Sequence, residues 1–213
     1  MDLEKEKLLF KNGHKLIAAT DEAGRGPLAG PVVSACVVVD KNFVITPELE
    51  KIRDSKKLSA KQRQILFPII KKSVKAVEIG ICDNEVVDKI NILQASFLSM
   101  RRALNKIDLK PDIVLVDGKF KIPKIDTPQE AIISGDNTVF SIAMASIIAK
   151  VSRDFIMEEM HKKYPLYCFD KHKGYGTKLH MEMISLYGPC PIHRLSFAPF
   201  SVPVDKINPW NIQ

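Results

Sequence analysis

The chain has 213 residues, of which 46% are hydrophobic and 27% are charged. A chain of this length and composition can bury one sizeable core, which excludes a disordered tail and a miniprotein that depends on disulfides. The 32 lysines and arginines exceed the 25 aspartates and glutamates, so the formal net charge is +7. This excess suits a polyanionic partner such as a nucleic acid, but it does not identify one.

The cysteines and the N-terminal segment indicate the compartment. Four cysteines are too few for a disulfide scaffold in a chain this long, and they form no CxxC motif. The charged start of the chain does not resemble a signal peptide, and the longest apolar run, 32–39, is far shorter than the roughly 20 residues of a membrane span. We therefore expect a cytoplasmic, monomeric protein with reduced thiols and no membrane contact.

Apolar runs alternate with amphipathic stretches over the first 160 residues. Strands are predicted at 15–20, 32–39, 74–81, 113–116 and 131–133. Helices are predicted at 54–72, with Ser59 as N-cap, at 84–107 and at 141–160. This order predicts an α/β fold in which helices flank a sheet. The sheet should be mixed, because only a glycine-rich loop separates the first two strands and a hairpin is expected there.

The composition changes after residue 160. Residues 161–213 contain four of the five histidines and six of the thirteen prolines. We expect this segment to be a helical appendage with extended loops. It should close over the same face as the motifs of residues 1–160, within one structural unit.

Acidic residues follow several of the predicted strands. Asp21 and Glu22 come after the first strand, Asp117 after 113–116, and Asp136 after 131–133. Strand ends project side chains into a common crevice, where carboxylates repel each other until a divalent cation such as Mg²⁺ neutralises them. The pattern is typical of phosphodiester chemistry with two metal ions. For any one of these residues, a solubilising role at the end of a strand is the alternative.

Two glycine-containing segments are candidate substrate contacts. In the loop Gly24-Arg25-Gly26, the glycines let backbone amides approach an anion, although an ordinary tight turn has the same pattern. Tyr175 lies between two glycines and could present its ring to a sugar or base, while Lys173 would meet a phosphate. A core tyrosine in a glycine turn is the alternative. The pair Lys56-Lys57 is either a further phosphate contact or a solvated surface.

A zinc site is a separate possibility. Cys168 and His172 are four residues apart, and Cys190 and His193 are three apart, so the four side chains could bind zinc tetrahedrally. The spacing fits no common zinc finger. The competing interpretation is that the thiols are buried and the histidines contact backbone or phosphate.

The sequence resembles the ribonuclease HII family. The similarity is carried by TDEAGRGPLAGPVVSACVVV, DSKKLS, LVDG, SIAMASIIAKVSRD, KHKGYGT and YGPCPIHRLSF, in the family's order between about residues 15 and 200. This resemblance implies a ribonuclease H-like mixed sheet flanked by helices, with a catalytic core at 1–160 and a C-terminal helical part at 161–213. It also implies an endoribonuclease that cleaves the RNA strand of RNA–DNA hybrids and incises 5′ of ribonucleotides embedded in duplex DNA.

The matched motifs imply roles for individual residues. The metal ligands, for Mg²⁺ or Mn²⁺ in a two-ion site, would be Asp21, Glu22, Asp117 and Asp136. The residues that contact the substrate would be Gly24, Arg25, Gly26, Lys57, Lys173 and Tyr175, with the glycine loop and Tyr175 at the 2′-OH of the RNA–DNA junction. Cleavage would leave 5′-phosphate and 3′-hydroxyl ends.

The match to the family's motifs has one departure, and three alternatives stand beside it. Thr138 stands where the family usually has lysine, and Asp154 is a second candidate for the fourth acid; its place inside a predicted long helix favours Asp136. Arg25 and the short lead-in before the first strand distinguish the chain from ribonuclease HIII, which has a Gly-Lys-Gly loop and an extra N-terminal domain. The alternative from another class is a non-catalytic protein that binds duplex nucleic acid.

Overall fold

The computed structural model describes residues 2–52 and 58–201. Its centre is a five-stranded sheet with the spatial order β3-β2-β1-β4-β5. The strands are β1 (Leu16–Ala23), β2 (Val32–Asp40), β3 (Ala76–Cys82), β4 (Ile113–Asp117) and β5 (Gln129–Ile132). The β1–β2 and β2–β3 pairs are antiparallel, and the β1–β4 and β4–β5 pairs are parallel. The predicted mixed sheet is therefore confirmed.

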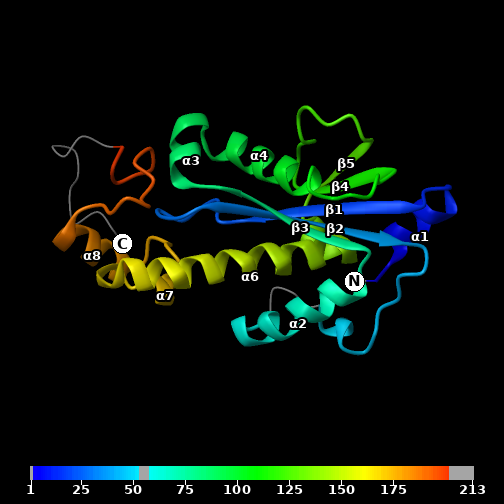
Figure 1. Ribbon diagram of the computed structural model, residues 1–213, viewed down its shortest axis with the longest axis horizontal. Coiled ribbons are helices and arrows are strands. Elements are labelled where there is room, and N and C mark those ends of the chain that lie inside the picture. The colour runs from blue at the N-terminus through cyan, green and yellow to red at the C-terminus, as the bar shows by residue number, and fades with distance from the viewer. Residues whose placement is uncertain (1, 53–57, 202–213) are drawn as a thin grey trace.

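Helices cover both faces of this sheet. They are α1 (Glu4–Lys11), α2 (Ala60–Ser73), α3 (Asn84–Ile90), α4 (Ile92–Leu104), α5 (Gly135–Thr138), α6 (Phe140–Lys163), α7 (Phe169–His172) and α8 (Lys178–Tyr187), with a 3₁₀ turn at Pro165–Tyr167. In Figure 1, α3 and α4 lie on one side of the sheet and α2 and α6 on the other, while α7 and α8 lie beside the C-terminal end of α6. Within the described ranges, no helix is long and apolar enough to cross a bilayer.

The alternation of side chains along the strands separates two apolar layers. Ile17 and Ala19 of β1 belong to the layer that contains α6, whereas Ala18 packs in the layer that contains Met100 of α4. In β2, the first eight residues are buried. This explains why the sequence of β2 is apolar without alternation, since helices cover both of its faces.

The helix predicted over 84–107 is two helices, so that prediction was wrong. Asn91 adopts φ +64° between α3 and α4, and its side-chain oxygen accepts a hydrogen bond from the backbone N–H of Gln94 at 3.1 Å. Asparagine tolerates positive φ better than most residues and is a good N-cap. The apolar period continues across the break, which is why periodicity alone did not reveal it.

The boundaries of α2 and β5 also differ from the prediction. Helix α2 follows Ser59, whose hydroxyl accepts a hydrogen bond from the N–H of Gln62 at 3.2 Å, as the predicted N-cap requires; residues 54–57 of the predicted helix lie outside the described ranges. Strand β5 spans 129–132 instead of 131–133, because its pairing with β4 begins at Gln129 opposite Val114.

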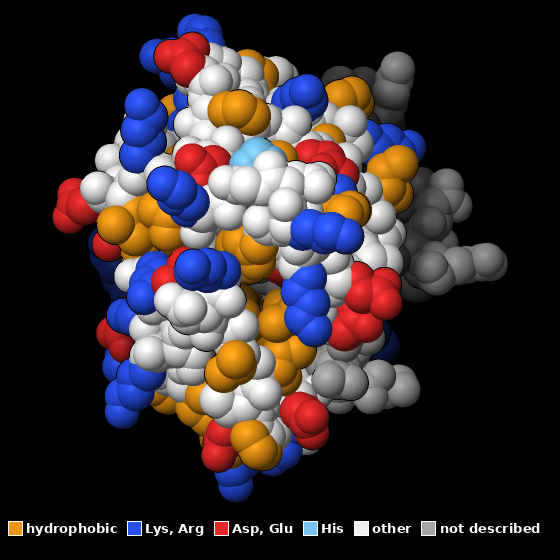
Figure 2. Space-filling view, turned by 90° about the vertical axis from the view of Figure 1, so that its right-hand side faces the viewer, with side chains coloured by type: hydrophobic (Ala, Val, Ile, Leu, Met, Phe, Trp, Pro, Cys, Tyr) orange, Lys and Arg blue, Asp and Glu red, His pale blue; other side chains and the backbone are white. Residues whose placement is uncertain are grey.

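The end of the molecule at which α1 lies carries charges of both signs. Figure 2 shows lysine and arginine side chains there, interspersed with acidic and apolar ones. The net positive charge of the chain is therefore not gathered into a single basic surface at this end, which lies away from α8 (Figure 1).

Candidate active site

Parallel pairing of β1 with β4 brings Asp21 and Asp117 to the same edge of the sheet. Thr20 is in register with Val116, so the next residue on each strand is an aspartate. Asp21 comes two residues after Ala19, and Asp117 comes two residues after Leu115; Ala19 and Leu115 both belong to the α6 layer. Side chains two residues apart in a strand point to the same face of the sheet. The two carboxylates therefore project from neighbouring strands toward the same side.

Strand β1 is longer than the sequence predicts. It continues to Ala23, so Asp21 and Glu22 lie within the strand and pair with Ala35 and Ser34 of β2. The prediction placed both acids just after the strand. The antiparallel partner β2 extends β1 beyond the point where pairing with β4 stops, and this fixes the backbone that carries the acids.

Burial and neighbouring charge act together on Asp21. Only 6% of the residue is exposed. Loss of hydration raises the pKa of this carboxyl well above its ordinary value, and the Glu22 and Asp117 carboxylates raise it further. Two hydrogen bonds lower the pKa of Asp21 without reversing the shift. One comes from the Ser146 hydroxyl, and the other comes from the Glu22 N–H, which is 2.7 Å from Oδ1 of Asp21. The site is therefore electrostatically unfavourable without a cation.

Glu22 has one satisfied and one unsatisfied carboxylate oxygen. Its Oε1 accepts a hydrogen bond from Nη1 of Arg25 at 3.2 Å. Its Oε2 is buried without a hydrogen-bond partner among the described residues. Burial raises the pKa of Glu22, and the Asp117 carboxylate raises it further, whereas Arg25 lowers it in part. A buried oxygen that has no donor, beside two more carboxylates, is the environment that suits a hard divalent cation.

Asp136 is linked to the same acids through its main chain. Its N–H donates to Oδ1 of Asp117 at 3.2 Å, and its own Oδ1 accepts from the Asn137 amide at 2.7 Å. It lies in the short helix α5 and not directly at a strand end. Thr138, at the position of the family's lysine, donates its hydroxyl to the Ser134 carbonyl at 3.2 Å. The alternative acid, Asp154, is bonded to Lys150 at 2.7 Å along α6.

As the side chains stand, no three His, Cys, Asp or Glu residues of the described ranges are grouped so that they could hold a metal ion, and this applies to the four acids as well as to the cysteines and histidines. What argues against the zinc interpretation is that His172 and His193 are hydrogen-bonded to main-chain groups of Tyr167 and Cys190, as the competing interpretation expects of the histidines. The carboxylates of the β1–β4 edge differ from these histidines. Glu22 carries a buried oxygen without a donor among the described residues, and the Glu22 and Asp117 carboxylates raise the pKa of Asp21, so this group of acids suits a divalent cation.

Arg194 fixes the glycine loop that follows β1. The side chain is fully buried, and it donates to the carbonyl oxygens of Gly24 at 2.6 Å, Arg25 at 3.0 Å and Gly30 at 3.0 Å. In a trans peptide the N–H points opposite to the C=O. The N–H groups of Arg25 and Gly26 are therefore directed away from Arg194.

A second buried arginine joins this loop to the segment around Tyr175. Arg153 of α6 donates to the carbonyl oxygens of Pro31 at 2.9 Å, Ala29 at 3.1 Å and Lys173 at 2.9 Å. Its side chain also fills the space beside Gly24, where an added Cβ would lie 2.1 Å from the Arg153 Nε. Gly24 has φ +97°, so the turn needs glycine for its backbone as well.

Tyr175 lies beside the glycine loop and is partly exposed, and its contact with the substrate stays a prediction. The residue is 43% exposed, and a Cβ built on Gly26 would be 3.9 Å from its ring. The N–H of Leu28 donates to the Gly174 carbonyl at 2.8 Å, which fastens the two loops together. Nζ of Lys150 lies 5.8 Å from the centre of the Tyr175 ring. The exposed ring argues against the alternative of a core tyrosine.

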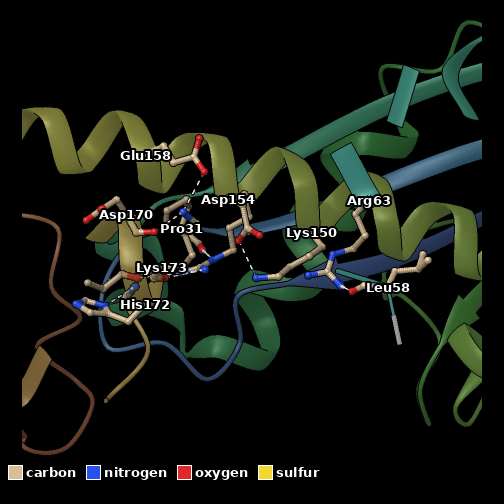
Figure 3. A network of polar contacts seen from close by, with 12 residues as sticks. Pro31, Leu58, Arg63, Lys150, Asp154, Glu158, Asp170, His172 and Lys173 are labelled. Carbon is tan, nitrogen blue, oxygen red and sulfur yellow. Dashed lines mark hydrogen bonds and ion pairs between the residues drawn. The ribbon is translucent and has the colours of Figure 1, made fainter. Parts of the chain in front are cut away.

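The two predicted phosphate contacts, Lys173 and Lys57, both stay predictions. Figure 3 shows the Lys173 ammonium directed at Glu158, at 3.0 Å, and it also donates to the Asp170 carbonyl at 2.7 Å. A phosphate contact by Lys173 stays a prediction that requires this ion pair to open. Lys57 lies outside the described residues.

Three functional candidates were missed by sequence reasoning. Arg153 and Arg194 lie inside motifs that carry the family resemblance, but five of their six carbonyl partners are 122 to 170 residues away, so no local pattern marks their role. Ser146 donates to Asp21 from within α6. Its only signal is a hydroxyl in an otherwise small and apolar stretch of the helix.

The mixed sheet flanked by helices, with carboxylates at the edge shared by β1 and β4, defines a ribonuclease H-like protein. The crystal structure of ribonuclease H2 from Pyrococcus horikoshii has the same architecture, with a TM-score of 0.71 and 28% identity over 87% of this chain and 95% of that one. Bst ribonuclease HIII in complex with Mn²⁺ shares the fold, with a TM-score of 0.69 and 19% identity over 88% of this chain and 68% of that one.

The chain belongs to the ribonuclease HII family, whose model matches residues 18–200. The ribonuclease HII of Caldicellulosiruptor bescii is 53% identical over 195 residues, which cover 91% of this chain and 92% of that protein. The predicted family and fold class are thus confirmed. Membership supports an endoribonuclease activity on RNA–DNA hybrids, and therefore a hydrolase of the nuclease class in a metal-dependent family.

Proposed function

We propose that this protein incises 5′ of ribonucleotides embedded in duplex DNA, as well as cleaving the RNA strand of hybrids, by hydrolysis with two metal ions. The observation that carries the proposal is the buried Asp21 beside the partly buried Glu22 and Asp117, with one Glu22 oxygen buried without a hydrogen-bond partner among the described residues. Such a group destabilises the protein unless it binds a cation. A protein that only binds the phosphates of a duplex has no use for it.

The ligands of Mg²⁺ or Mn²⁺ would be Asp21, Glu22, Asp117 and Asp136. When bound, the ions supply an activated water and stabilise the leaving oxygen. The chain's own contribution is to hold these carboxylates ready. Pairing of β1 with β2 fixes Asp21 opposite Ala35, and the N–H of Asp136 holds the Asp117 carboxylate at 3.2 Å.

The loop at 24–26 and Tyr175 would recognise the ribonucleotide. The Arg25 and Gly26 N–H groups are directed away from Arg194, so they can donate to a sugar hydroxyl or a phosphate. The Tyr175 ring beside them offers a flat apolar surface to the adjoining sugar. The 2′-OH is the group that distinguishes RNA from DNA at a given position.

A DNA duplex with a single ribonucleotide tests the proposal and separates it from a non-catalytic role. The purified protein should cut it 5′ of the ribonucleotide with Mg²⁺ present and leave it intact in EDTA. The products should carry 5′-phosphate and 3′-hydroxyl ends. Binding of the duplex without cleavage under any divalent cation would favour the non-catalytic alternative.

A further inference from the structure

Three buried histidines lie directly behind the Tyr175 loop. His172, His180 and His193 are 8%, 0% and 1% exposed, and they come from α7, α8 and the segment after α8. The rings of His172 and His180 are stacked with centroids 4.3 Å apart. The Nε2 atoms of His180 and His193 are 3.1 Å apart. The proposed chemistry at Asp21 does not use any of these side chains.

Main-chain partners at both ends of the His193–His180 pair determine where the protons lie. A main-chain N–H can only donate and a carbonyl can only accept. The Cys190 N–H is 2.8 Å from Nδ1 of His193, so this nitrogen accepts and the His193 proton is on Nε2. The Cys190 carbonyl oxygen is further from Nδ1 of His193, at 3.2 Å. A proton on this Nδ1 would be repelled by the closer N–H of Cys190.

The proton on His193 then determines the state of His180. Because Nε2–H of His193 donates to Nε2 of His180, the His180 proton must be on Nδ1. That Nδ1–H donates to the carbonyl oxygen of Tyr175 at 2.9 Å. The result is one continuous chain of hydrogen bonds, running from the Cys190 N–H through two neutral imidazoles to the backbone of Tyr175. We call these two imidazoles the histidine relay.

His172 completes the attachment of the loop. Its Nδ1 accepts from the Gly174 N–H at 3.2 Å, and its Nε2–H donates to the Tyr167 carbonyl at 2.8 Å. Its own carbonyl accepts from the Tyr175 N–H at 2.9 Å. The Tyr175 N–H is therefore held on the His172 side, and its C=O is held both by His180 and by the Thr177 N–H at 2.8 Å, which leaves its exposed ring on a fixed backbone.

The surroundings keep the relay neutral. Burial lowers the pKa of all three histidines, to about 4 for His180. The groups that face them are mainly aromatic, with Phe169 centred 5.5 Å from His180 and Phe200 centred 5.3 Å from His193. Asp170 and Lys173 act on His172 with opposite effects on its pKa. A second proton on His180 would also face the Nε2–H of His193.

We propose that His180 and His193 are positioning residues, which hold Tyr175 at the substrate surface through the fixed tautomers of the relay. The inference rests on the proposed function, since it takes Tyr175 as the residue that contacts the ribonucleotide. The relay itself follows from hydrogen-bond geometry and can be observed without substrate.

Two variants of His180 separate positioning from general stability. In His180→Asn, the amide nitrogen replaces Nδ1 and keeps the bond to the Tyr175 carbonyl. In His180→Gln, the amide lies near the former Nε2 and that bond is lost. We expect kcat/KM on a duplex with one ribonucleotide to fall about tenfold in the glutamine variant, the equivalent of about 1.4 kcal/mol. The asparagine variant should stay within about threefold of the parent.

A double-mutant cycle tests whether the effect passes through Tyr175. If it does, His180→Gln should change kcat/KM by less than about twofold when it is added to Tyr175→Ala. An undiminished tenfold effect in that background would overturn the positioning role. Equal losses in the asparagine and glutamine variants of the parent would overturn it as well.

Imidazole ¹⁵N chemical shifts of the protein at neutral pH test the relay without any cleavage. We expect the Nδ1–H tautomer at His180 and the Nε2–H tautomer at His172 and His193. A charged ring or the opposite tautomer at His180 would overturn the relay, whatever the activity. If the parent cleaves neither a hybrid nor an embedded ribonucleotide, the proposed function fails, while these shifts still decide whether the relay exists.

Discussion

Arg194 donates to the carbonyl oxygen of Gly24 at 2.6 Å, across 170 residues of sequence. The same buried guanidinium holds two more carbonyls of the loop, so the segment that follows α8 determines the shape of the turn that follows Asp21 and Glu22. Burial and the nearby Arg153 charge lower the pKa of Arg194 to about 9. This arginine is held by main-chain dipoles rather than by a carboxylate.

Replacing Arg194 by lysine should destabilise the protein and reduce cleavage. Lysine can satisfy only part of the fork of three bonds, and each buried carbonyl left without a donor costs about 1–3 kcal/mol. We expect urea unfolding to show a loss of about 2–4 kcal/mol. Arg101→Lys is the matched control, because Arg101 makes a single exposed bond to the Pro123 carbonyl. Equal stability of the two variants would argue against a role for Arg194 in holding the loop.

Gly24→Ala should be more harmful than the same change at Gly13. The two glycines have nearly the same φ, +97° and +96°, so the backbone penalty of about 1–2 kcal/mol is shared. Only at Gly24 does the added Cβ meet an obstacle, with Nε of Arg153 at 2.1 Å, whereas nothing lies within 4 Å at Gly13. We expect Gly24→Ala to lose stability beyond the Gly13 control and to lose cleavage activity, whereas Gly13→Ala keeps it. Equal unfolding free energies would contradict the close fit of Arg153.

Asp21→Asn should stabilise the metal-free protein. Because the pKa of Asp21 is raised in the folded state, the charged form destabilises the fold at every pH above its ordinary pKa. We expect Tm in EDTA to increase, by about 2–4 °C for each kcal/mol recovered. Asp112→Asn should act in the opposite direction, since backbone N–H groups of Leu16 and Lys15 lower the pKa of Asp112. A lower Tm for Asp21→Asn in EDTA would show that its charge is compensated within the chain.

The histidine relay predicts a loss of stability in acid. The pKa of His180 is lowered to about 4 in the folded state, from an ordinary value near 6.5, so the unfolded chain binds more protons between these values. Stability is complete above about pH 6.5 and falls as the pH drops toward 4, by up to about 3 kcal/mol for this residue. Unfolding free energies measured from pH 7 to 4 should fall less steeply in His180→Asn. Identical pH profiles would show that His180 does not titrate in this way.

The sequence predicts candidate residues where their immediate neighbours in the chain mark them. Tyr175 between two glycines and Asp21 beside Glu22 were recognised as candidates because neighbouring residues mark them, and the structure brings their loops together through Leu28 and Gly174. The buried run of β2 was equally readable, because a strand covered on both faces has no polar side.

Long-range contacts were not readable in the same way. Arg153 and Arg194 donate to main-chain carbonyl oxygens. Every residue has such an oxygen, so the residue types of the glycine loop do not reveal that these arginines bind there. The break at Asn91 was hidden because the apolar residues keep their helical spacing on both sides of it. Only the Asn91 side chain, which caps the second helix, marks the place where the first helix ends. The tautomers of the relay depend on which main-chain group faces each ring, and only the folded chain shows this.

The most direct test of the central claim is single-turnover cleavage by Asp21→Asn with Mg²⁺, on a duplex that contains one ribonucleotide, together with the Kd for the same duplex. Asparagine keeps the shape of the side chain and removes the charge that would hold the ion. We predict that cleavage is lost while Kd stays within a few-fold of the parent. Cleavage at the parent's rate would contradict the assignment of this carboxylate to the metal site.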